Sequence, residues 1–218
     1  KEMAAIRVKE FMNYELTELM PEYYEDFESM LLYLPVVGSA FRKVYWDDIL
    51  ARPVSEWIGI DQFVVSNFAR DLRKVPRFTQ IIPYTPEDLR KEMESGFYAA
   101  VDIGSPSTID DNSISHKMYE TFGVGTGFTL KDEIHEVLEQ HVEMDLEGFI
   151  APYVISLDRG SRKILAIRRN WQEGDSSYVK KDYFIHYKFV PGFGFYGLGF
   201  IHLLGNFQLT LTAVMRSL

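Results

Sequence analysis

The chain of 218 residues contains no cysteine, which excludes disulfide bonds, thiolate nucleophiles and zinc ribbons and is compatible with a reducing compartment. It also lacks a long apolar run, because the longest stretch, 193–204, is rich in glycine and shorter than the roughly 18 residues of a membrane helix. The opening residues, KEMAAIRVKE, do not resemble a secretory signal. Because the chain begins without methionine and stops within a helical pattern, we expect it to be a fragment of a longer protein.

The sequence motifs of common active sites are missing as well. There is no G-x-S-x-G nucleophile elbow, no H-E-x-x-H zinc motif and no lysine after a glycine loop. His186 and His202 have no serine or acidic partner in the local sequence, so we interpret both as structural histidines. The Asp110-Asp111 pair is typical of a turn. We therefore expect a protein that is not an enzyme and that uses no cofactor and no metal.

The chain also has no excess of basic residues: 23 Lys and Arg stand against 32 Asp and Glu, which gives a formal net charge of -9. A general nucleic-acid binder would carry a basic face, which this composition argues against. An acidic surface can still guide DNA that has to pass without being held, since positive charge governs phosphate contacts. Aromatic residues make up 15% of the chain, which favours buried aromatic clusters or a subunit interface.

The most distinctive stretch is 183–206, which reads YFIHYKFVPGFGFYGLGFIHLLGN. Its first residues alternate and are mostly aromatic or β-branched, which predicts a strand that ends at Pro191. Glycines and aromatic residues then alternate in a corner. From about Leu198 the apolar residues return at helical spacing. The stretch thus predicts a strand, a glycine–aromatic corner and a helix.

Gly192, Gly194 and Gly197 match the G-x-G-x-x-G pattern of dinucleotide-binding loops. Three features argue against that function: bulky aromatics stand between the glycines, no Asp or Glu occurs in 198–218, and no βαβ unit follows. We prefer a close-packed corner in which glycines let backbone segments approach. A nucleotide-binding enzyme that uses the Gly192–Gly197 loop remains the alternative.

Local patterns predict an α+β fold with N-terminal helices and antiparallel hairpins. We expect a helix over 3–18 and a second over 21–33, stopped by Pro35 and Gly38. Thr85 and the following Pro86 mark a helix start. The other expected elements are strands at 41–46, 54–60, 62–65 and 77–84, a helix at 87–94 that closes at Gly96, a strand from about 136, and a hairpin of 153–157 with 163–169.

The segment 102–130 is the least regular part of the sequence, and we expect a loop there with a short helix at 113–121. We place an approximate domain boundary after it, which divides the chain into 1–130 and 131–218. The sequence shows no internal repeat and no low-complexity linker.

Two clusters of polar residues are candidates for binding. On a strand, Glu139, His141, Glu143 and Asp145 share one face beside His135, which is compatible with a metal site, but the spacing matches no dedicated zinc or calcium loop. We therefore prefer a solvated acidic strand face.

The compact basic and aromatic group Arg168-Arg169-Asn170-Trp171 is the second cluster. Arg168, Arg169 and Trp171 are suited to contact a phosphate backbone or an aromatic ring. They are equally suited to pair with acidic residues of a neighbouring subunit, which we prefer slightly.

Four segments resemble the portal proteins of tailed double-stranded-DNA bacteriophages, of the short-tailed type. They are MPEYYEDFESMLLYLPVVGSAFRKVYWD, RPVSEWIGIDQFVV, PYVISLDRGSRKILAIRRNW and FIHYKFVPGFGFYGLGFIHLLGN. The last two are the most specific, because the hairpin, RRNW and the glycine–aromatic corner occur in that order. The similarity is spread over nearly the whole chain.

The resemblance implies a twelvefold homo-oligomeric ring at one capsid vertex, through which double-stranded DNA is packaged and ejected. It implies terminase, the major capsid protein and tail adaptor proteins as partners, no membrane, and a location in the virion after assembly in the host cytoplasm. Residues 1–130 would include the wing-like region, and the chain after 198 would enter a stem helix. An acidic channel wall would let DNA move without being held.

A ring requires a heterologous interface that closes on itself. We predict that this interface includes the aromatic residues of the corner: Phe193, Phe195, Tyr196 and Phe200. A phage adaptor protein that forms no ring is a further alternative.

Overall fold

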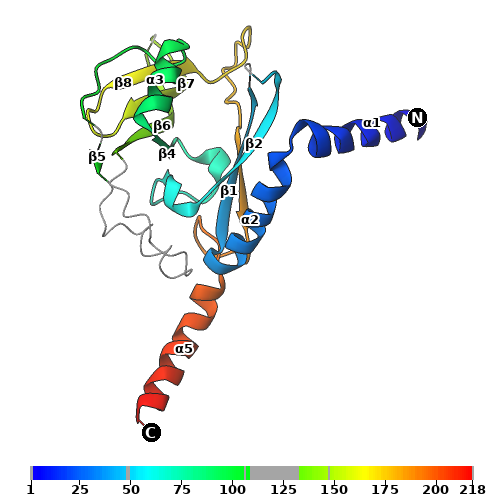
Figure 1. The fold of residues 1–218 in the computed structure, drawn as a ribbon, viewed down its shortest axis with the longest axis vertical. Helices are drawn as coiled ribbons and strands as arrows, with labels where there is room; N and C mark the ends of the chain where they lie inside the picture. The colour runs from blue at the N-terminus through cyan, green and yellow to red at the C-terminus, as the bar shows by residue number, and fades with distance from the viewer. Residues whose placement is uncertain (1, 48–49, 106, 109–132, 147, 218) are drawn as a thin grey trace. The chain divides into compact units, whose positions relative to one another are not determined.

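The computed structural model describes residues 2–47, 50–105, 107–108, 133–146 and 148–217. The chain forms two compact units, neither of them continuous in sequence. Unit 1 comprises 1–60, 70–73 and 182–218, and unit 2 comprises 61–69 and 74–181 (Figure 1). The boundary expected near residue 130 lies outside the described residues.

Unit 1 contains the N-terminal helices. Helix α1 (Glu2–Tyr14) continues into a π-helical turn, η1 (Glu15–Leu19), and α2 follows (Glu22–Val37). The expected stop of the second helix at Pro35 is wrong, because α2 includes this proline in its last turn. Proline has no N–H, so the helix loses one backbone hydrogen bond at this position. The loss is tolerated because the helix ends within the same turn. The helix ends at Gly38, which has a φ of 95° and donates its N–H to the carbonyl of Leu34.

The sheet of unit 1 is antiparallel, and within the described residues its strand order is β2-β1-β9. Strand β1 (Ser39–Asp47) pairs with β2 (Arg52–Ile58) as the predicted hairpin, and Phe41 lies opposite Ile58. On its other side β1 pairs with β9 (Phe184–Lys188), which comes from the far end of the chain. Long-range pairing of this kind joins the two ends of the sequence in one unit.

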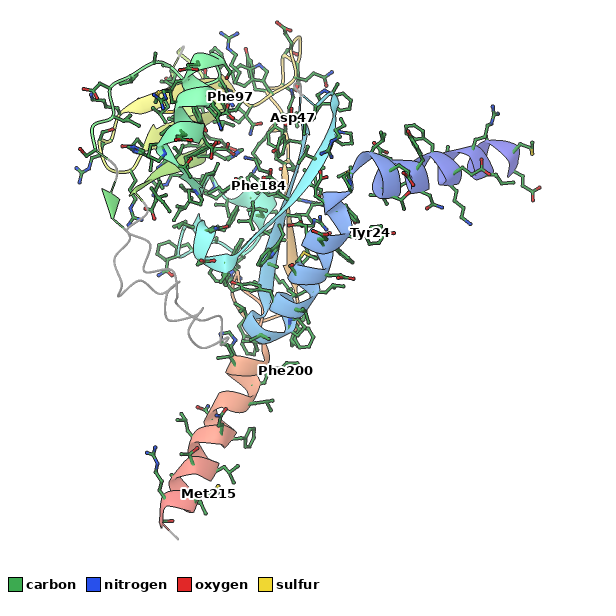
Figure 2. All side chains as sticks on the ribbon, in the orientation of Figure 1. Tyr24, Asp47, Phe97, Phe184, Phe200 and Met215 are labelled. Atoms are coloured by element: carbon green, nitrogen blue, oxygen red, sulfur yellow. The ribbon has the colours of Figure 1, made fainter. Side chains whose placement is uncertain are left out.

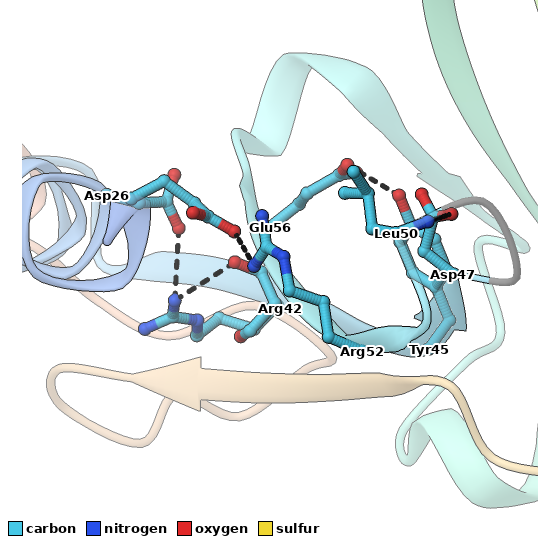
Figure 3. A network of polar contacts seen from close by, with 9 residues as sticks. Asp26, Arg42, Tyr45, Asp47, Leu50, Arg52 and Glu56 are labelled. Carbon is cyan, nitrogen blue, oxygen red and sulfur yellow. Dashed lines mark hydrogen bonds and ion pairs between the residues drawn. The ribbon is translucent and has the colours of Figure 1, made fainter. Parts of the chain in front are cut away.

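Helix α2 covers the sheet of unit 1, with Met30 and Phe41 in the buried interior. Arg42, whose side chain is only 3% exposed, connects the helix to the hairpin. Its Nη2 donates to Asp26 Oδ2 at 3.1 Å and to the Ser55 carbonyl at 3.3 Å (Figure 3). Its guanidinium also lies over the ring of Tyr23, 4.6 Å from the centroid. This network fixes α2 on β1 and β2.

Unit 2 is built on an antiparallel sheet. Within the described residues its main strand order is β3-β4-β6-β7-β8, and β5 pairs with β6 outside this path. The strands are β3 (Phe63–Val65), β4 (Arg77–Tyr84), β5 (Ser107–Thr108), β6 (Glu133–Asp145), β7 (Ile150–Asp158) and β8 (Ile164–Arg169). Two short 3-10 turns, η2 (Ile60–Gln62) and η3 (Leu72–Lys74), lie where the sequence changes from one unit to the other, and Ile60, Leu72 and Arg73 belong to unit 1.

Helix α3 (Pro86–Glu94) packs on the sheet of unit 2. It begins where the sequence predicts, since the Thr85 hydroxyl accepts a hydrogen bond from the Asp88 N–H at 3.2 Å. The core beneath it contains Leu89, Tyr98, Val137 and Leu165. The helices and antiparallel sheets together confirm the α+β fold class. The helix expected at 113–121 and the Asp110-Asp111 turn lie outside the described residues.

Candidate functional site

The candidate site of this protein is the junction that holds helix α5 (Phe200–Ser217) in unit 1. The chain leaves β9, turns through the glycine corner and is closed by an antiparallel bridge between Val190 and Leu198. The Leu198 N–H donates to the Val190 carbonyl at 2.7 Å. Helix α5 begins directly after this bridge, beside the end of α2 (Figure 1).

Glycine is required in the corner because the backbone of α2 occupies the space of a side chain. A Cβ on Gly199 would lie 2.3 Å from the carbonyl oxygen of Val36, and one on Gly197 would lie 2.3 Å from that of Gly38. A Cβ on Gly192 would meet the carbonyl oxygen of Tyr196 at 2.8 Å. These contacts confirm a close-packed corner. Protein backbone thus occupies the space beside the glycines in which a dinucleotide-binding loop would hold a phosphate.

A buried serine, Ser39, and a half-buried histidine, His186, complete the junction. The Gly197 N–H donates to Ser39 Oγ at 2.7 Å, and Ser39 Oγ lies 3.2 Å from His186 Nε2. The imidazole of His186 packs against the rings of both Phe41 and Phe195, with centroid distances of 4.5 and 4.6 Å, and these two rings also contact each other. Burial, assisted by the Lys188 ammonium, lowers the pKa of His186 to about 4. The ring is therefore neutral at pH 7, and its Nε2 can accept a hydrogen bond from the Ser39 hydroxyl.

Both histidines of the corner thus have hydrogen-bond partners within unit 1, and the partner of His186 is a serine that is distant in the sequence. His202 lies in the first turn of α5, and its Nδ1 accepts a hydrogen bond from the Gly199 N–H at 3.2 Å. That contact satisfies a backbone donor at the beginning of the helix, as a capping residue does.

The four aromatic residues expected at a subunit interface have different environments. Phe193 is fully exposed, and Tyr196 and Phe200 are 37% and 47% exposed. Phe195 is only 5% exposed, because its ring stacks on Phe41 inside unit 1. Phe195 therefore belongs to the interior of the unit and has to be removed from the predicted surface. Phe193, Tyr196 and Phe200 remain candidates.

Helix α5 carries an apolar stripe that the sequence analysis described only in part. Seven of its exposed side chains fall within an arc of about 120° at 100° per residue, and no described residue of the helix is buried. The helix contains no Asp or Glu, and Figure 2 labels Phe200 at its beginning and Met215 near its end. The residues of the stripe are Phe200, Leu203, Leu204, Phe207, Leu211, Val214 and Met215.

The Arg168–Trp171 group is largely used within unit 2. Arg168 donates from Nη2 to the Phe97 carbonyl at 2.8 Å, and its guanidinium lies 3.5 Å from the centroid of the Phe97 ring. Arg169 lies over the ring of Trp171 at 5.6 Å, and Trp171 meets Tyr153 edge to face at 5.3 Å. Arg169 is exposed, so it is the member of the group best placed to meet a partner.

The acidic face of strand β6 is only partly solvated. Glu143 and Asp145 are exposed as expected, but the same expectation is wrong for Glu139 and His141, which are 7% and 3% exposed. Glu139 Oε1 lies 3.0 Å from His141 Nε2, and this pair satisfies part of the polarity buried in unit 2. His135, also buried, lies 3.4 Å from Asp158 Oδ1. No group of three potential metal ligands occurs in the described ranges.

Comparison of the sequence with models of known protein families and with curated proteins finds no match. The portal resemblance therefore depends on the four segments quoted above. Among the helices that the structure describes, none is long and apolar enough to cross a bilayer.

Proposed function

We propose that this chain is part of a portal subunit, a structural protein that assembles into a ring at one vertex of a phage capsid and lets viral DNA pass. The observation that carries the proposal is the apolar stripe of α5. Its seven side chains are 40–73% exposed, and only Phe200, which meets the Phe189 ring at 5.1 Å, lies at the covered end of the stripe. Water is a poor solvent for so large an apolar area. A neighbouring copy in a closed ring would cover it.

The glycine corner supports the same proposal. A helix that contributes to a ring must leave each subunit in the same direction, because a heterologous interface closes only at one rotation. The contacts of Gly197 and Gly199 with the end of α2 fix where α5 begins. The four segments that resemble portal proteins include this corner and the start of α5, which is the proposed stem helix.

The charge of α5 is also suited to a channel that passes DNA. The side opposite the apolar stripe carries the polar residues Asn206, Thr212 and Ser217 beside the apolar Leu209, with Arg216 as its one formal charge. Neutral polar side chains meet phosphates without the strong attraction that would hold the DNA in place. The same absence of acids means that the acidic wall expected from the sequence would have to come from other segments. Terminase, the major capsid protein and tail adaptor proteins are the proposed partners.

The two alternatives receive less support. An enzyme that binds a nucleotide at Gly192–Gly197 would need the corner open to a phosphate, but the end of α2 fills the space at Gly197. An adaptor protein would use α5 to bind a different protein and would form no ring of its own.

The test is the mass in solution of the protein and of two matched variants. Full burial of one apolar side chain contributes about 1.5–3 kcal/mol. Association costs about 4–15 kcal/mol of lost translational and rotational freedom, so the loss of two such side chains removes a large share of the free energy that offsets this cost. Leu204→Lys combined with Leu211→Lys should therefore convert the ring into subunits. Leu209→Lys is the control, because Leu209 is 70% exposed but lies on the opposite side of α5. Assembly that survives the double change would refute the stripe as the interface.

A further inference from the structure

A pocket of about 440 Å³ lies between the segment 70–73 and strand β9. All its lining residues belong to unit 1, and none belongs to the glycine corner. Leu72 and Phe184, which are 9% and 7% exposed, supply apolar lining. A volume of this size suits one small ligand or one nucleotide of a longer chain.

The pocket is lined by more basic than acidic residues, although the chain as a whole is acidic. Arg70, Arg73 and Lys188 line it together with two carboxylates, those of Asp71 and Asp182. In the described part of the chain no ion pair involves Arg70 or Lys188. Asp71 Oδ1 accepts a hydrogen bond from the Arg73 N–H at 3.1 Å, so part of the negative charge is used by its own turn. Arg70 and Lys188 are therefore the cations that can meet a ligand, and the Lys188 ammonium also lies 5.9 Å from the centroid of the Phe195 ring.

His186 reports the electrostatic character of the same pocket. It forms part of the lining, and the Lys188 ammonium adds to the effect of burial in lowering its pKa to about 4. The Asp71 carboxylate acts on this pKa in the opposite direction but with a smaller effect, so the combined effect of the two charges at His186 is that of a cation. An anion bound there would oppose that effect and would itself be stabilised.

We propose that this pocket binds a phosphate group, which Arg70 and Lys188 hold while the attached organic part lies against Leu72 and Phe184. Guanidinium and ammonium groups are the side chains that proteins use for phosphate, as a bidentate donor and as a point charge respectively. The phosphate can belong to a free nucleotide or to the backbone of a nucleic acid. The site does not require the ring proposed above.

Footprinting of Lys188 with an acetylating reagent, read by mass spectrometry on the intact folded protein, tests the site directly. The probes are tripolyphosphate, ADP, a short single-stranded oligodeoxynucleotide and poly-glutamate. Protection of Lys188 by the phosphate compounds, with Lys9 on α1 unprotected, supports the proposal. Protection by ADP indicates a free nucleotide, whereas protection by the oligonucleotide alone indicates a nucleic-acid backbone. Equal protection by poly-glutamate, or no protection at all, would overturn it.

Binding of the protecting probe to variants gives an independent measurement. Removal of one phosphate contact should weaken binding about tenfold. For the single-stranded oligodeoxynucleotide it should also reduce the slope of log affinity against log salt by about 0.7. We expect this for Arg70→Ala and for Lys188→Met, and Met retains the stem whose Cβ lies near Gly197. Arg90→Ala removes an exposed arginine of α3 and should change neither quantity.

The conservative variant Lys188→Arg keeps the charge and should retain most of the affinity, which separates loss of contact from loss of structure. Equal affinity of Arg70→Ala, Lys188→Met and the unchanged protein would show that the pocket is not the phosphate site. Because all these measurements can be made on separate subunits, a failure of the pocket would leave the ring proposal unaffected, and the reverse also holds.

Discussion

Replacement of Gly199 by alanine should destabilise unit 1 far more than such a small change normally does. The added methyl group would lie 2.3 Å from the Val36 carbonyl oxygen and 2.6 Å from both Gly38 N and the carbonyl carbon of Val37. Ordinary van der Waals contacts begin at 3.4 Å. The end of α2 and the start of α5 would therefore have to move apart by about 1 Å, because close-packed interiors have no room to absorb the group.

The magnitude follows from the kind of atoms that are displaced. Overpacking of a core by one methylene typically costs about 1–3 kcal/mol. Here the neighbours are backbone atoms of a helix end whose cap, Gly38, has a φ of 95°, so they cannot rotate away as a side chain can. We expect the upper end of the range, about 3 kcal/mol. A Cβ added to Gly194 would meet no atom within 4 Å, so Gly194→Ala should be neutral or stabilising by up to about 1 kcal/mol.

Urea unfolding at one protein concentration measures both changes. Trp46 and Trp57 belong to unit 1 and Trp171 to unit 2, so fluorescence in a Trp171→Phe background follows unit 1 alone. Gly205→Ala is a second control within α5, where nothing lies near the added group and alanine favours the helix by about 1 kcal/mol. A free energy of unfolding for Gly199→Ala that equals that of Gly194→Ala would refute the account of the corner.

Three further changes test other parts of unit 1 by the same unfolding assay. Arg42→Met should cost about 2–3 kcal/mol, because it leaves the half-buried Asp26 carboxylate, whose pKa burial already raises, without its cation; no loss would show that the pair is unimportant. His186 has a folded-state pKa of about 4 against 6.5 for the free side chain, so the unfolded chain binds the proton first and stability should fall as pH drops from 6.5 to 4. After allowance for screening the fall due to His186 is on the order of 1–2 kcal/mol, and His186→Phe should reduce the total fall by that amount; a pH dependence equal to that of the unchanged protein would contradict this assignment. Phe195→Ala should cost about 3–5 kcal/mol as a core deletion, whereas Phe193→Ala should leave the subunit's stability unchanged; equal effects would contradict the burial of Phe195.

Much of the fold can be predicted from local sequence because its signals are local. Thr85 and the following proline identify the start of α3, and alternation identifies β4, whose bounds Arg77–Tyr84 agree with the expected strand. Pro35 shows the limit of such rules. A proline in the last turn of a helix costs little, and Gly38, in the left-handed conformation, is the residue that ends α2.

The sequence could not predict which segments pack against the glycine corner. Its glycines indicate that two backbone segments approach closely, but nothing local identifies the end of α2 as the other segment. The same holds for Phe193 and Phe195, which are two residues apart in a turn and have opposite environments. Sequence pattern assigned them equal weight, because the direction of each side chain depends on the tertiary path of the corner.

Which face of strand β6 is buried was similarly ambiguous from the sequence. The sequence correctly places Glu139 and His141 on one face, but charge alone suggested solvent. Val137 lies on that face and is fully buried, and it was the available signal that the face turns inward. The burial of a Glu–His pair becomes acceptable only when the two side chains bond each other, which a linear pattern does not show.

Electron microscopy of the assembled full-length protein, analysed only for rotational symmetry, tests the central claim most directly. The portal account predicts closed rings, with twelve copies as the resemblance implies and a central hole wide enough for a DNA duplex. Monomers, dimers or open chains under the same conditions would contradict it.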